Sequence, residues 1–260
     1  MKSKVVIIPV PYEKTTSYGK GTKNGPKAIL CAFKQVERYD IELNRPTDNI
    51  AIKILPAVKD IKKINYDFSG GNLPIYFGGE HTITAAIIAA IKTSRRDFSI
   101  LHLDAHSDLR DTYGGTKYSH ACVMRRIWEM GVAFVSVGVR SESYEESRFI
   151  KREGIKIHYA HQIHKDKDWI KKITKRLSKN IYISFDVDVF DPAVVRATGT
   201  PEPGGLTWYQ VVDLFSAIKK ANKNLIGMDI VELSPVKADL ASSFACAALL
   251  HKILAIFCLK

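Results

Sequence analysis

The sequence predicts an α/β fold, organised as one domain over residues 1–260, with a mostly parallel sheet that helices cover on both faces. Apolar runs of strand length alternate with longer helical patterns along the whole chain, which is typical of strand–helix–strand units. No Ser- or Gly-rich linker, internal repeat or change in composition divides the 260 residues. A chain of this length can also bury a large core.

The expected strands are short apolar runs bounded by polar or turn residues. In chain order they lie in residues 5–10, 52–58, 73–81, 98–103, 133–139, 155–159, 181–191 and 225–231. The run at 98–103 is of the kind found in strands that are buried on both faces.

Helical patterns separate most of these strands. They cover residues 26–36, 82–93, 122–130, 166–177, 207–220 and 239–259. Pro26 suits the first turn of its helix, because its fixed φ matches a helix and its missing N–H is not needed there. Thr82 and Thr207 are expected to cap their helices through their hydroxyl groups.

Composition argues against several classes of protein. The formal net charge is +12, but the basic residues are scattered along helical segments without interleaved aromatic residues, so we expect no nucleic-acid partner. No apolar run reaches the ~18 residues of a spanning helix, so we expect no membrane association. The short apolar run after the basic start ends in prolines and is not a signal peptide. Four cysteines without C-x-x-C spacing indicate free thiols and a cytoplasmic protein.

Metal-ligand residues directly follow the apolar run at 98–103. Asp104, His106 and Asp108 are each two residues apart, and in an extended chain side chains at this spacing point to the same face. An isolated D-x-H pattern is more often a solvated loop than a metal site. Here the triplet follows a buried strand and has a partner further along the chain, so we interpret it as part of a metal site.

Two other strand ends carry the same kinds of residue. Asp186 and Asp188 end the apolar run that begins at Ile181, and His81 follows the run that begins at Leu73. Parallel α/β sheets place their sites at the carboxyl ends of strands, so these side chains are expected to meet. Six ligands exceed the needs of one tetrahedral site but suit two cations that share bridging carboxylates. Four aspartates and two imidazoles favour Mn²⁺ over Zn²⁺ or Mg²⁺.

Three motifs resemble the signature motifs of the ureohydrolase family, the arginases and agmatinases. They are GGEHT at 78–82, DAHSD at 104–108 and SFDVDVFDP at 184–192, in the family's order. The resemblance extends from the first strand to the last helix. It implies a three-layer α/β/α fold of the arginase type and a site for two Mn²⁺ per chain. Glu80 stands where the family more commonly has Asp, and we interpret it as a change outside the ligand shell.

The resemblance also assigns the six ligands to the two ions. It places one ion between His81 and Asp108 and the other between His106 and Asp188, with Asp104 and Asp186 bridging them. A hydroxide shared by the ions would attack the guanidinium carbon of the substrate, and Asp108 would orient it. The tetrahedral intermediate would then collapse to urea and an amine.

Two further residues gain a catalytic role only through the resemblance. A lone histidine such as His120, at the end of the turn-rich stretch 110–121, is more often structural. Glu232, just beyond the strand at 225–231, reads by itself as a solvated or capping acid. Their positions match the family's loop histidine near the substrate and the carboxylate that grips the guanidinium group. We therefore expect His120 to protonate the leaving amine and Glu232 to bind the guanidinium.

Agmatine is the substrate that the resemblance favours, with putrescine and urea as products and polyamine biosynthesis as the setting. Arginases carry an Asn-containing loop after the DAH motif that holds the carboxylate and ammonium of the amino acid, and this chain has Leu109, Arg110 and Asp111 there. The segments 117–121 and 198–206 also look like those of agmatinases.

The ammonium end of agmatine needs acceptors and acids. We expect the loop 110–120 and the segment 198–205 to present them, with Asp111 and Glu202 as the nearest acidic candidates by sequence. A solvated surface position is the alternative for either acid. Arg110 would recruit a carboxylate if it pointed inward, and we expect it instead to pack outward or to pair with an acid.

Other activities stay open. They are arginase, guanidinobutyrase and aminopropyl-agmatine ureohydrolase activity, and, from another class, a catalytically silent metal-binding or interaction protein. The presence of all the expected ligands, with His120 and Glu232, argues against the last. Family members commonly form trimers or hexamers, so the expected partners are a small cationic guanidino substrate and further copies of the chain, as a homotrimer or homohexamer.

Overall fold

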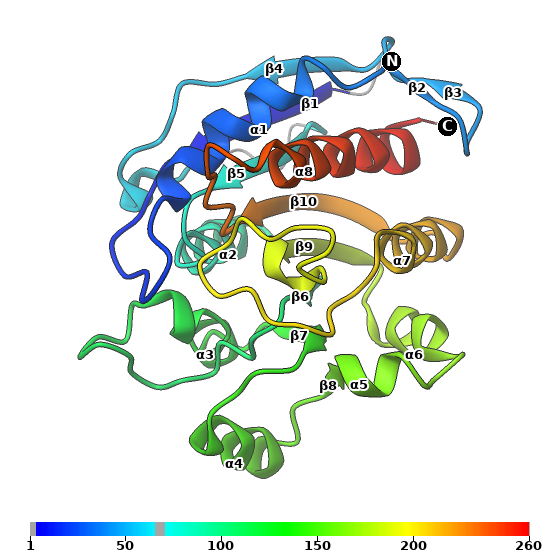
Figure 1. Cartoon of the computed structure of the whole chain (residues 1–260). Coiled ribbons are helices and arrows are strands. Elements are labelled where there is room, and N and C mark those ends of the chain that lie inside the picture. The colour runs from blue at the N-terminus through cyan, green and yellow to red at the C-terminus, as the bar shows by residue number, and fades with distance from the viewer. Residues whose placement is uncertain (1–3, 66–70, 260) are drawn as a thin grey trace.

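A computed structural model describes residues 4–65 and 71–259 of the protein. Its main strands are β1 (Lys4–Val10), β4 (Ala51–Ile54), β5 (Leu73–Gly78), β6 (Phe98–Leu103), β7 (Ala133–Val139), β8 (Ile157–Tyr159), β9 (Asn180–Asp186) and β10 (Asn224–Val231). They form one eight-stranded sheet in the order β4-β1-β5-β10-β9-β6-β7-β8, in which every neighbouring pair is parallel. Figure 1 shows this order from β4 at the top to β8 at the bottom. A short antiparallel pair, β2 (Tyr39–Asp40) and β3 (Arg45–Pro46), lies outside this sheet.

Helices cover both faces of the sheet. They are α1 (Gly25–Phe33), α2 (Ile83–Ser94), α3 (Val123–Glu129), α4 (Tyr144–Glu153), α5 (Ala160–Ile163), α6 (Trp169–Arg176), α7 (Trp208–Lys220) and α8 (Leu240–Ile253). Buried residues of α1, α6, α7 and α8 share one apolar core, and those of α2, α3 and α4 share another. Ile7 and Ile8 of β1 belong to different cores, because successive strand residues point to opposite faces. The expected three-layer α/β/α fold is confirmed.

The strand order creates a crevice at the centre of the sheet. Strand β6 follows β5 in the chain but is not its neighbour in the sheet. The two positions between them are occupied by β10 and β9, which come later in the chain. Ligands of open α/β sheets bind beyond the carboxyl ends of strands at such a switch point. The predicted metal ligands follow β5, β6 and β9, and Glu232 follows β10, so all of them arrive at one place.

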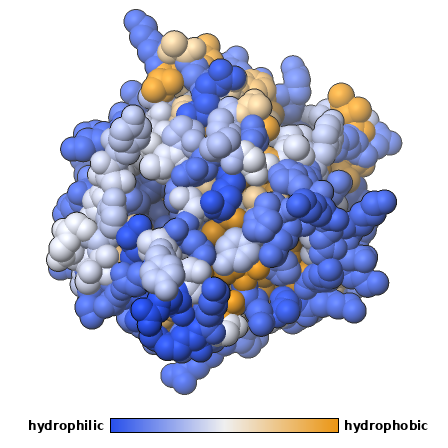
Figure 2. Space-filling model, turned by 60° about the horizontal axis from the view of Figure 1, so that its bottom comes forward, coloured by the Kyte–Doolittle hydropathy of each residue, from blue (hydrophilic) through white to orange (hydrophobic). Residues whose placement is uncertain are grey.

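The basic residues of α6 lie on its solvated face, as expected. On α6, Lys171, Lys172 and Lys175 are exposed, whereas Trp169 and Ile173 are buried against the sheet. Figure 2 shows a largely hydrophilic face, on which apolar side chains are visible mainly near its centre and in a few places at its margin. Part of the positive charge therefore comes from the solvated face of an amphipathic helix.

The predicted helix ends differ from the structure in several places. The first helix ends at Phe33 rather than near residue 36, and the helix expected over 166–177 begins only at Trp169. The α4 helix was not predicted. It begins with a capping box, in which Ser143 and Glu146 each accept a hydrogen bond from the other's backbone N–H.

Only one of the two predicted threonine caps is correct. The Thr207 side chain accepts a hydrogen bond from Gln210 N at the start of α7. Thr82 instead has helical backbone angles, and its hydroxyl donates to Glu80 Oε1 at 2.6 Å. The predicted Thr82 cap is therefore wrong, because a capping residue needs non-helical backbone angles to turn its hydroxyl oxygen toward the first N–H groups of the helix.

The segment Leu240–Cys258 is long and apolar enough, by length and composition, to cross a membrane. Our expectation that no run reaches this length is therefore wrong. The core helix of a soluble protein passes the same test, and 67% of the segment's most apolar window is buried inside the structure. Leu249, Leu250 and Leu254 pack in the core against one face of the sheet.

Candidate metal centre and active site

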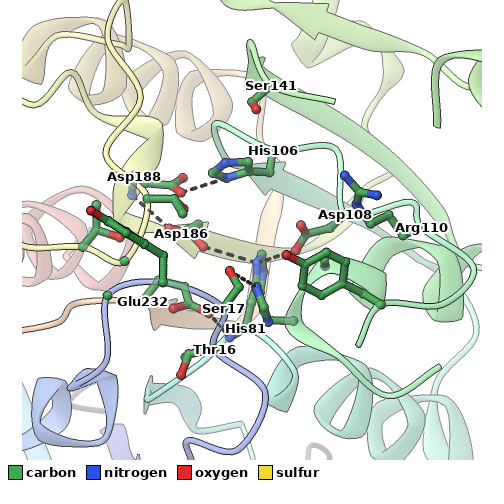
Figure 3. A pocket seen from close by; sticks show the side chains of 18 of the residues that line it. Thr16, Ser17, His81, His106, Asp108, Arg110, Ser141, Asp186, Asp188 and Glu232 are labelled. Atoms are coloured by element: carbon green, nitrogen blue, oxygen red, sulfur yellow. Dashed lines mark hydrogen bonds and ion pairs between the residues drawn. The ribbon is translucent and has the colours of Figure 1, made fainter. Parts of the chain in front are cut away.

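A cavity of about 220 Å³ opens over the carboxyl ends of the central strands. Its lining includes His81, Asp108, Asp186, Asp188 and Glu232, which Figure 3 shows converging on its floor. The wall contains residues 16–19, which follow β1, and residues from the loop that precedes α3. The sequence-predicted ligands are thus brought together at one end of the sheet.

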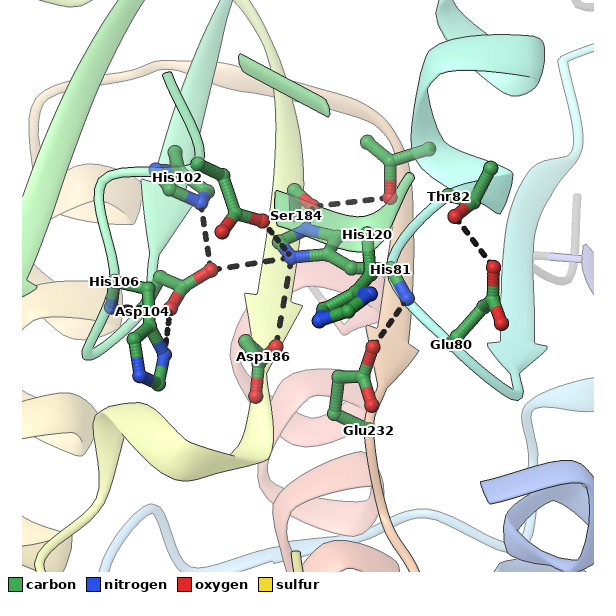
Figure 4. A network of polar contacts seen from close by, with 12 residues as sticks. Glu80, His81, Thr82, His102, Asp104, His106, His120, Ser184, Asp186 and Glu232 are labelled. Carbon is green, nitrogen blue, oxygen red and sulfur yellow. Dashed lines mark hydrogen bonds and ion pairs between the residues drawn. The ribbon is translucent and has the colours of Figure 1, made fainter. Parts of the chain in front are cut away.

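His81 faces three carboxylates. Its Nδ1 atom lies 3.1 Å from Asp104 Oδ2, 3.2 Å from Asp108 Oδ2 and 3.4 Å from Asp186 Oδ2. All four side chains are buried, and Figure 4 shows His81 at the centre of the network. Burial acts to lower the pKa of His81, but Asp104 and Asp108 outweigh it and raise that pKa well above its usual range. An imidazole nitrogen that faces carboxylates in this way is a typical metal-ligand arrangement.

His106 forms a second group on the other side of Asp104. Its Nδ1 atom lies 3.0 Å from Asp188 Oδ2 and 3.5 Å from Asp104 Oδ1. Backbone N–H groups fix the acids, since Ala105 N donates to Asp188 Oδ1 at 2.9 Å and His106 N donates to Asp104 Oδ1 at 2.6 Å. Asp104 thus contacts both histidines, as a bridging ligand must. The assignment of individual ligands to ions stays a prediction.

Two site residues have unusual backbone conformations. Asp108 has φ 52° and Glu232 has φ 64°, both in the left-handed region that non-glycine residues seldom adopt. Such strain costs of order 1–3 kcal/mol and persists where the surroundings fix the chain. Here it turns both carboxylates toward the cavity as the chain leaves the sheet.

The Glu232 carboxylate is buried and held at one oxygen. His81 N donates to Glu232 Oε1 at 2.6 Å, and Glu232 N donates to Gly79 O at 2.8 Å. Burial raises the pKa of Glu232 to about 8, against the lowering effect of the His81 N–H. Among the described residues, its second oxygen accepts no hydrogen bond, so that atom is available to a cationic ligand.

His120 lies in the cavity wall, where it contacts the loop that follows β1. Its Nδ1 atom is 3.3 Å from Thr15 Oγ1, and its backbone N–H donates to the same oxygen at 3.0 Å. Its Nε2 atom is 3.5 Å from Ser17 Oγ. The structure therefore places His120 at the cavity, as predicted, but its role in proton transfer stays a prediction.

Glu80 organises this wall and does not face the ligand cluster. Its carboxylate is fully buried and accepts hydrogen bonds from Lys14 N at 2.5 Å, Thr15 N at 2.6 Å, Thr15 Oγ1 at 2.7 Å and Thr82 Oγ1 at 2.6 Å. The chain can approach so closely because Gly79 has no side chain: a Cβ there would lie 2.0 Å from Tyr12 O. Glu80 thus links strand β5 to the loop that holds His120.

His102 is a site residue that the sequence analysis missed. Its Nε2 atom is 2.9 Å from Asp104 Oδ2, and its Nδ1 atom is 3.0 Å from Ser136 Oγ. Because Asp104 can only accept when ionised, Nε2–H donates to it and Nδ1 accepts from the serine. The signal was available, since His102 precedes Asp104 by two residues, the same spacing that identified the other ligands.

A second missed group fixes the His81 ring. His81 Nε2 lies 2.8 Å from Ser184 Oγ, which donates to Asp229 Oδ1 at 2.9 Å. Tyr182 and Thr84 donate to Asp229 Oδ2 at 2.8 and 3.0 Å. With Ser184 donating to the carboxylate, His81 donates through Nε2, so Nδ1 is the nitrogen that can present a lone pair to a metal ion beside the aspartates. The signal in the sequence was an acid inside the apolar run 225–231.

Arg140 was also missed, and it fastens the chain segment that carries Asp188. Its guanidinium donates to Asp188 O at 2.7 Å, Phe190 O at 3.2 Å and Glu202 O at 2.8 Å, and further to Gly138 O and Pro203 O. Carbonyl groups from three segments thus converge on one side chain, and nothing in the local sequence pattern predicts this.

Comparison with known proteins agrees with the geometry. The sequence matches the arginase family over residues 3–255, almost the whole chain. The chain belongs to the arginase family. It is 34% identical to the N(1)-aminopropylagmatine ureohydrolase of Synechocystis over 96% of this chain and 88% of that protein. It is also 34% identical to the agmatinase of Pyrococcus horikoshii, over 96% of this chain and 90% of that protein.

A solved structure of the same family matches the fold closely. The agmatine ureohydrolase of Thermoplasma volcanium has a TM-score of 0.85 and 30% identity, covering 98% of this chain and 89% of that one. The protein is therefore an arginase-family ureohydrolase, similar to agmatinases and to aminopropylagmatine ureohydrolases.

The residues of this ureohydrolase fit a pair of cations. His81 Nδ1 is buried without a hydrogen-bond partner, although three carboxylate oxygens lie within 3.4 Å. Burial, and then repulsion by Asp188 and Asp104, raise the pKa of Asp186 well above its usual range. An imidazole nitrogen and several carboxylates that converge in this way call for positive charge between them, which a bound proton or a metal ion can supply.

The residues expected at the substrate's ammonium end need correction. Asp111 pairs with Arg126 Nη2 at 2.8 Å and does not line the cavity, so its predicted role is wrong. Glu202 lies outside the lining as well, 4.0 Å from His106 Nε2. Arg110 does line the cavity and pairs with an acid as expected, with its Nε atom 3.6 Å from Glu146 Oε2.

Proposed function

We propose that this arginase-family ureohydrolase hydrolyses the guanidino group of agmatine to urea and putrescine, with two Mn²⁺ ions held by the His/Asp cluster. The arrangement of two histidines around Asp104 supports the proposal most directly, since each Nδ1 atom faces it from a different side. The ligand set, oxygen-rich with two imidazoles, suits Mn²⁺.

The charge of the site suits a cationic substrate. Two divalent ions carry +4, which balances the −4 of Asp104, Asp108, Asp186 and Asp188. Burial raises the pKa of Glu232 to about 8, and an entering guanidinium favours its ionised form, which gives the site a net negative charge. A guanidinium that enters the cavity is attracted there, while the basic surface is screened beyond a Debye length of ~8 Å.

The chain's own residues bind and orient the reactants. When bound, two divalent cations supply a water nucleophile at neutral pH and offset charge that develops on the substrate. Glu232 receives the guanidinium on its free oxygen, since its other oxygen is held by His81 N. Asp108, fixed by its strained backbone, orients the nucleophile toward the guanidinium carbon.

His120 carries the proton that the leaving amine needs. As the bond between the guanidino carbon and the alkyl-bearing nitrogen breaks, that nitrogen leaves as an amine and must be protonated. The imidazole lies in the cavity wall within reach of Thr15 and Ser17 hydroxyls, which hold its ring in place.

The cavity favours an amine over an amino acid. A buried, unpaired carboxylate costs several kcal/mol, so arginine would require a cation at its far end. Among the residues described, Arg110 is the only lysine or arginine in the lining. Glu146 lies beside its guanidinium, which also rests over the Tyr113 ring at 5.2 Å.

Aminopropyl-agmatine is a second candidate substrate. Several relatives at 34–35% identity are named as ureohydrolases of this compound, and its reaction differs from that of agmatine only in the tail of the leaving amine. Either product amine is a polyamine or its precursor. We therefore extend the proposal to polyamine biosynthesis in the cytoplasm, which the four free cysteines support.

Urea release from a panel of guanidines tests the proposal. The panel is agmatine, aminopropyl-agmatine, arginine and guanidinobutyrate, each with Mn²⁺-loaded protein, and Asp188→Asn serves as the control. We expect kcat/KM for an amine-ended guanidine to exceed that for arginine about a hundredfold, which corresponds to about 2.7 kcal/mol. Arginine as the best substrate, or no urea from any guanidine, would overturn it.

A further inference from the structure

Glu142 is the one cavity acid among the described residues that the site leaves free. Asp108, Asp186, Asp188 and Glu232 belong to the cluster, and Glu146 accepts hydrogen bonds from Ser107, Leu109 and Ser143 and lies beside Arg110. Within residues 4–65 and 71–259, Glu142 accepts only from the hydroxyl of Tyr159, at 3.2 and 3.3 Å. A carboxylate has about four acceptor positions, so most of its capacity remains for a ligand.

Tyr159 holds this carboxylate from the outer edge of the sheet. It ends β8, the strand beyond β7, and its hydroxyl lies within reach of both Glu142 oxygens. Burial, and then the charge of Glu142, raise the pKa of Tyr159 to about 12. The phenol therefore stays protonated at neutral pH and remains a donor that orients Glu142.

Glu142 and Glu232 lie far apart on the same cavity. Glu142 follows β7 and Glu232 follows β10, which are three places apart in the sheet. At 4.7–4.9 Å a strand, their backbones are separated by roughly 14 Å. In Figure 3, Ser141, the neighbour of Glu142, and Glu232 lie on opposite sides of the cavity.

The length of the substrate tail decides which compounds reach Glu142. An extended chain advances about 1.2 Å a bond. The six bonds from the guanidino carbon of agmatine to its ammonium therefore span about 7 Å. An added aminopropyl group makes ten bonds and about 12 Å. Hydrogen bonds to the two carboxylates add about 3 Å at each end. Agmatine then covers about 13 Å and the longer compound about 18 Å, so only the longer tail exceeds the roughly 14 Å between the two backbones.

We propose that Glu142, oriented by Tyr159, binds the outermost ammonium of a guanidine with a polyamine tail whose guanidino group lies at Glu232. This inference rests on the proposed function and names the substrate class of the same site. Glu142 acts on binding rather than on the chemical step, because it lies at the end remote from the bond that breaks. It makes the site selective for tail length and for a terminal positive charge.

The first test compares three guanidines in wild type and Glu142→Gln. We expect KM for aminopropyl-agmatine to rise tenfold or more, with kcat within twofold, since loss of remote binding raises KM alone. KM for agmatine should change less than threefold, and KM for butylguanidine, which has no terminal charge, should not change. Glu145→Gln is the matched control, because Glu145 is the exposed residue nearby outside the cavity. Tyr159→Phe should give a smaller rise than Glu142→Gln.

A binding measurement separates this inference from the proposed function. Calorimetric titration with spermidine, the triamine that hydrolysis of the longer substrate releases, should show at least tenfold weaker binding in Glu142→Gln. If wild type releases no urea while this loss is seen, the proposed function fails and the Glu142 subsite stands. If urea is released but neither KM nor spermidine binding changes, or if all three guanidines change equally, the subsite is wrong.

Discussion

At the scale of single residues, Glu80 shows how one carboxylate supports the active site without facing it. Four donors from Lys14, Thr15 and Thr82 converge on it. We predict that Glu80→Gln lowers the free energy of unfolding by about 2–3 kcal/mol, because an amide N–H₂ then meets buried donors. We also expect kcat to fall roughly tenfold, since Thr15 is hydrogen-bonded to His120. Scanning calorimetry and urea release measure the two effects.

Thr82→Val is the control for that prediction. It removes one of the four donors to Glu80 and leaves the links to Lys14 and Thr15 in place. Thr82→Val should lower the free energy of unfolding by about 1 kcal/mol, and its activity should stay within twofold of wild type. Equal effects of the two substitutions would show that Glu80 does not act through the loop.

The site could be predicted from the sequence where its residues follow strand ends at period-2 spacing. Asp104, His106 and Asp108 satisfy that rule, and the structure brings them together. Arg140 could not be found in this way, because its partners are backbone carbonyls of distant segments, which no side-chain pattern encodes. The prediction for the acids at the ammonium end was wrong for a related reason, because Asp111 forms an ion pair with Arg126 of the following helix.

At the scale of elements, Arg140 joins the turn after β9 to the loop at 202–203. We predict that Arg140→Lys weakens binding of one metal ion at least tenfold, because an ammonium cannot satisfy carbonyls on both segments and the turn carries Asp188. Binding of the ion on the His81 side should change little. Calorimetric titration with Mn²⁺ measures both events.

Arg152→Lys is the matched control on α4, where the arginine is exposed and pairs with Glu153. It should leave both binding events unchanged. Unchanged metal binding in Arg140→Lys would mean that the hydrogen bonds of Arg140 do not position Asp188.

Element types were easier to predict than element ends. Strands such as β1 are apolar at nearly every position, so their existence was clear from the sequence. The α4 helix was missed because its residues are mostly charged and its apolar contacts come from Phe149 and Ile150. Its capping box, Ser143 with Glu146, was the signal that could have found it.

At the scale of the whole molecule, a buried ion pair ties the first part of the chain to the last helix. Lys252 Nζ lies 2.7 Å from Asp40 Oδ2 and 3.2 Å from Glu42 Oε2. Burial acts to raise the pKa of Asp40, but the hydrogen bonds from Lys252 and Leu43 N outweigh it and lower that pKa. We predict that Asp40→Asn lowers the free energy of unfolding by about 3 kcal/mol at pH 7.

This cost should depend on pH in a defined direction. Because the folded pKa of Asp40 is below the unfolded value of about 3.9, its contribution is fully present above pH ~5 and is lost as pH falls through the folded pKa. The difference in unfolding free energy between wild type and Asp40→Asn should therefore shrink below pH ~4. A difference that stays constant from pH 7 to pH 3 would contradict the assignment.

Assembly is a further proposal at this scale. We propose a homotrimer or homohexamer, on the family relationship alone. Light scattering should then give a mass about three or six times the 29.2 kDa of the chain. A mass equal to one chain at working concentration would reject this proposal and would leave the active-site account untouched, because every cavity residue named here comes from one chain.

The most direct test of the central claim is to titrate metal-stripped protein with Mn²⁺ while urea release from agmatine and from aminopropyl-agmatine is measured. A site built around Asp104, with His81 on one side and His106 on the other, predicts that activity rises with the second equivalent of Mn²⁺ and reaches its plateau at two ions per chain. Full activity with a single tightly bound ion, or no urea with two, would contradict the account.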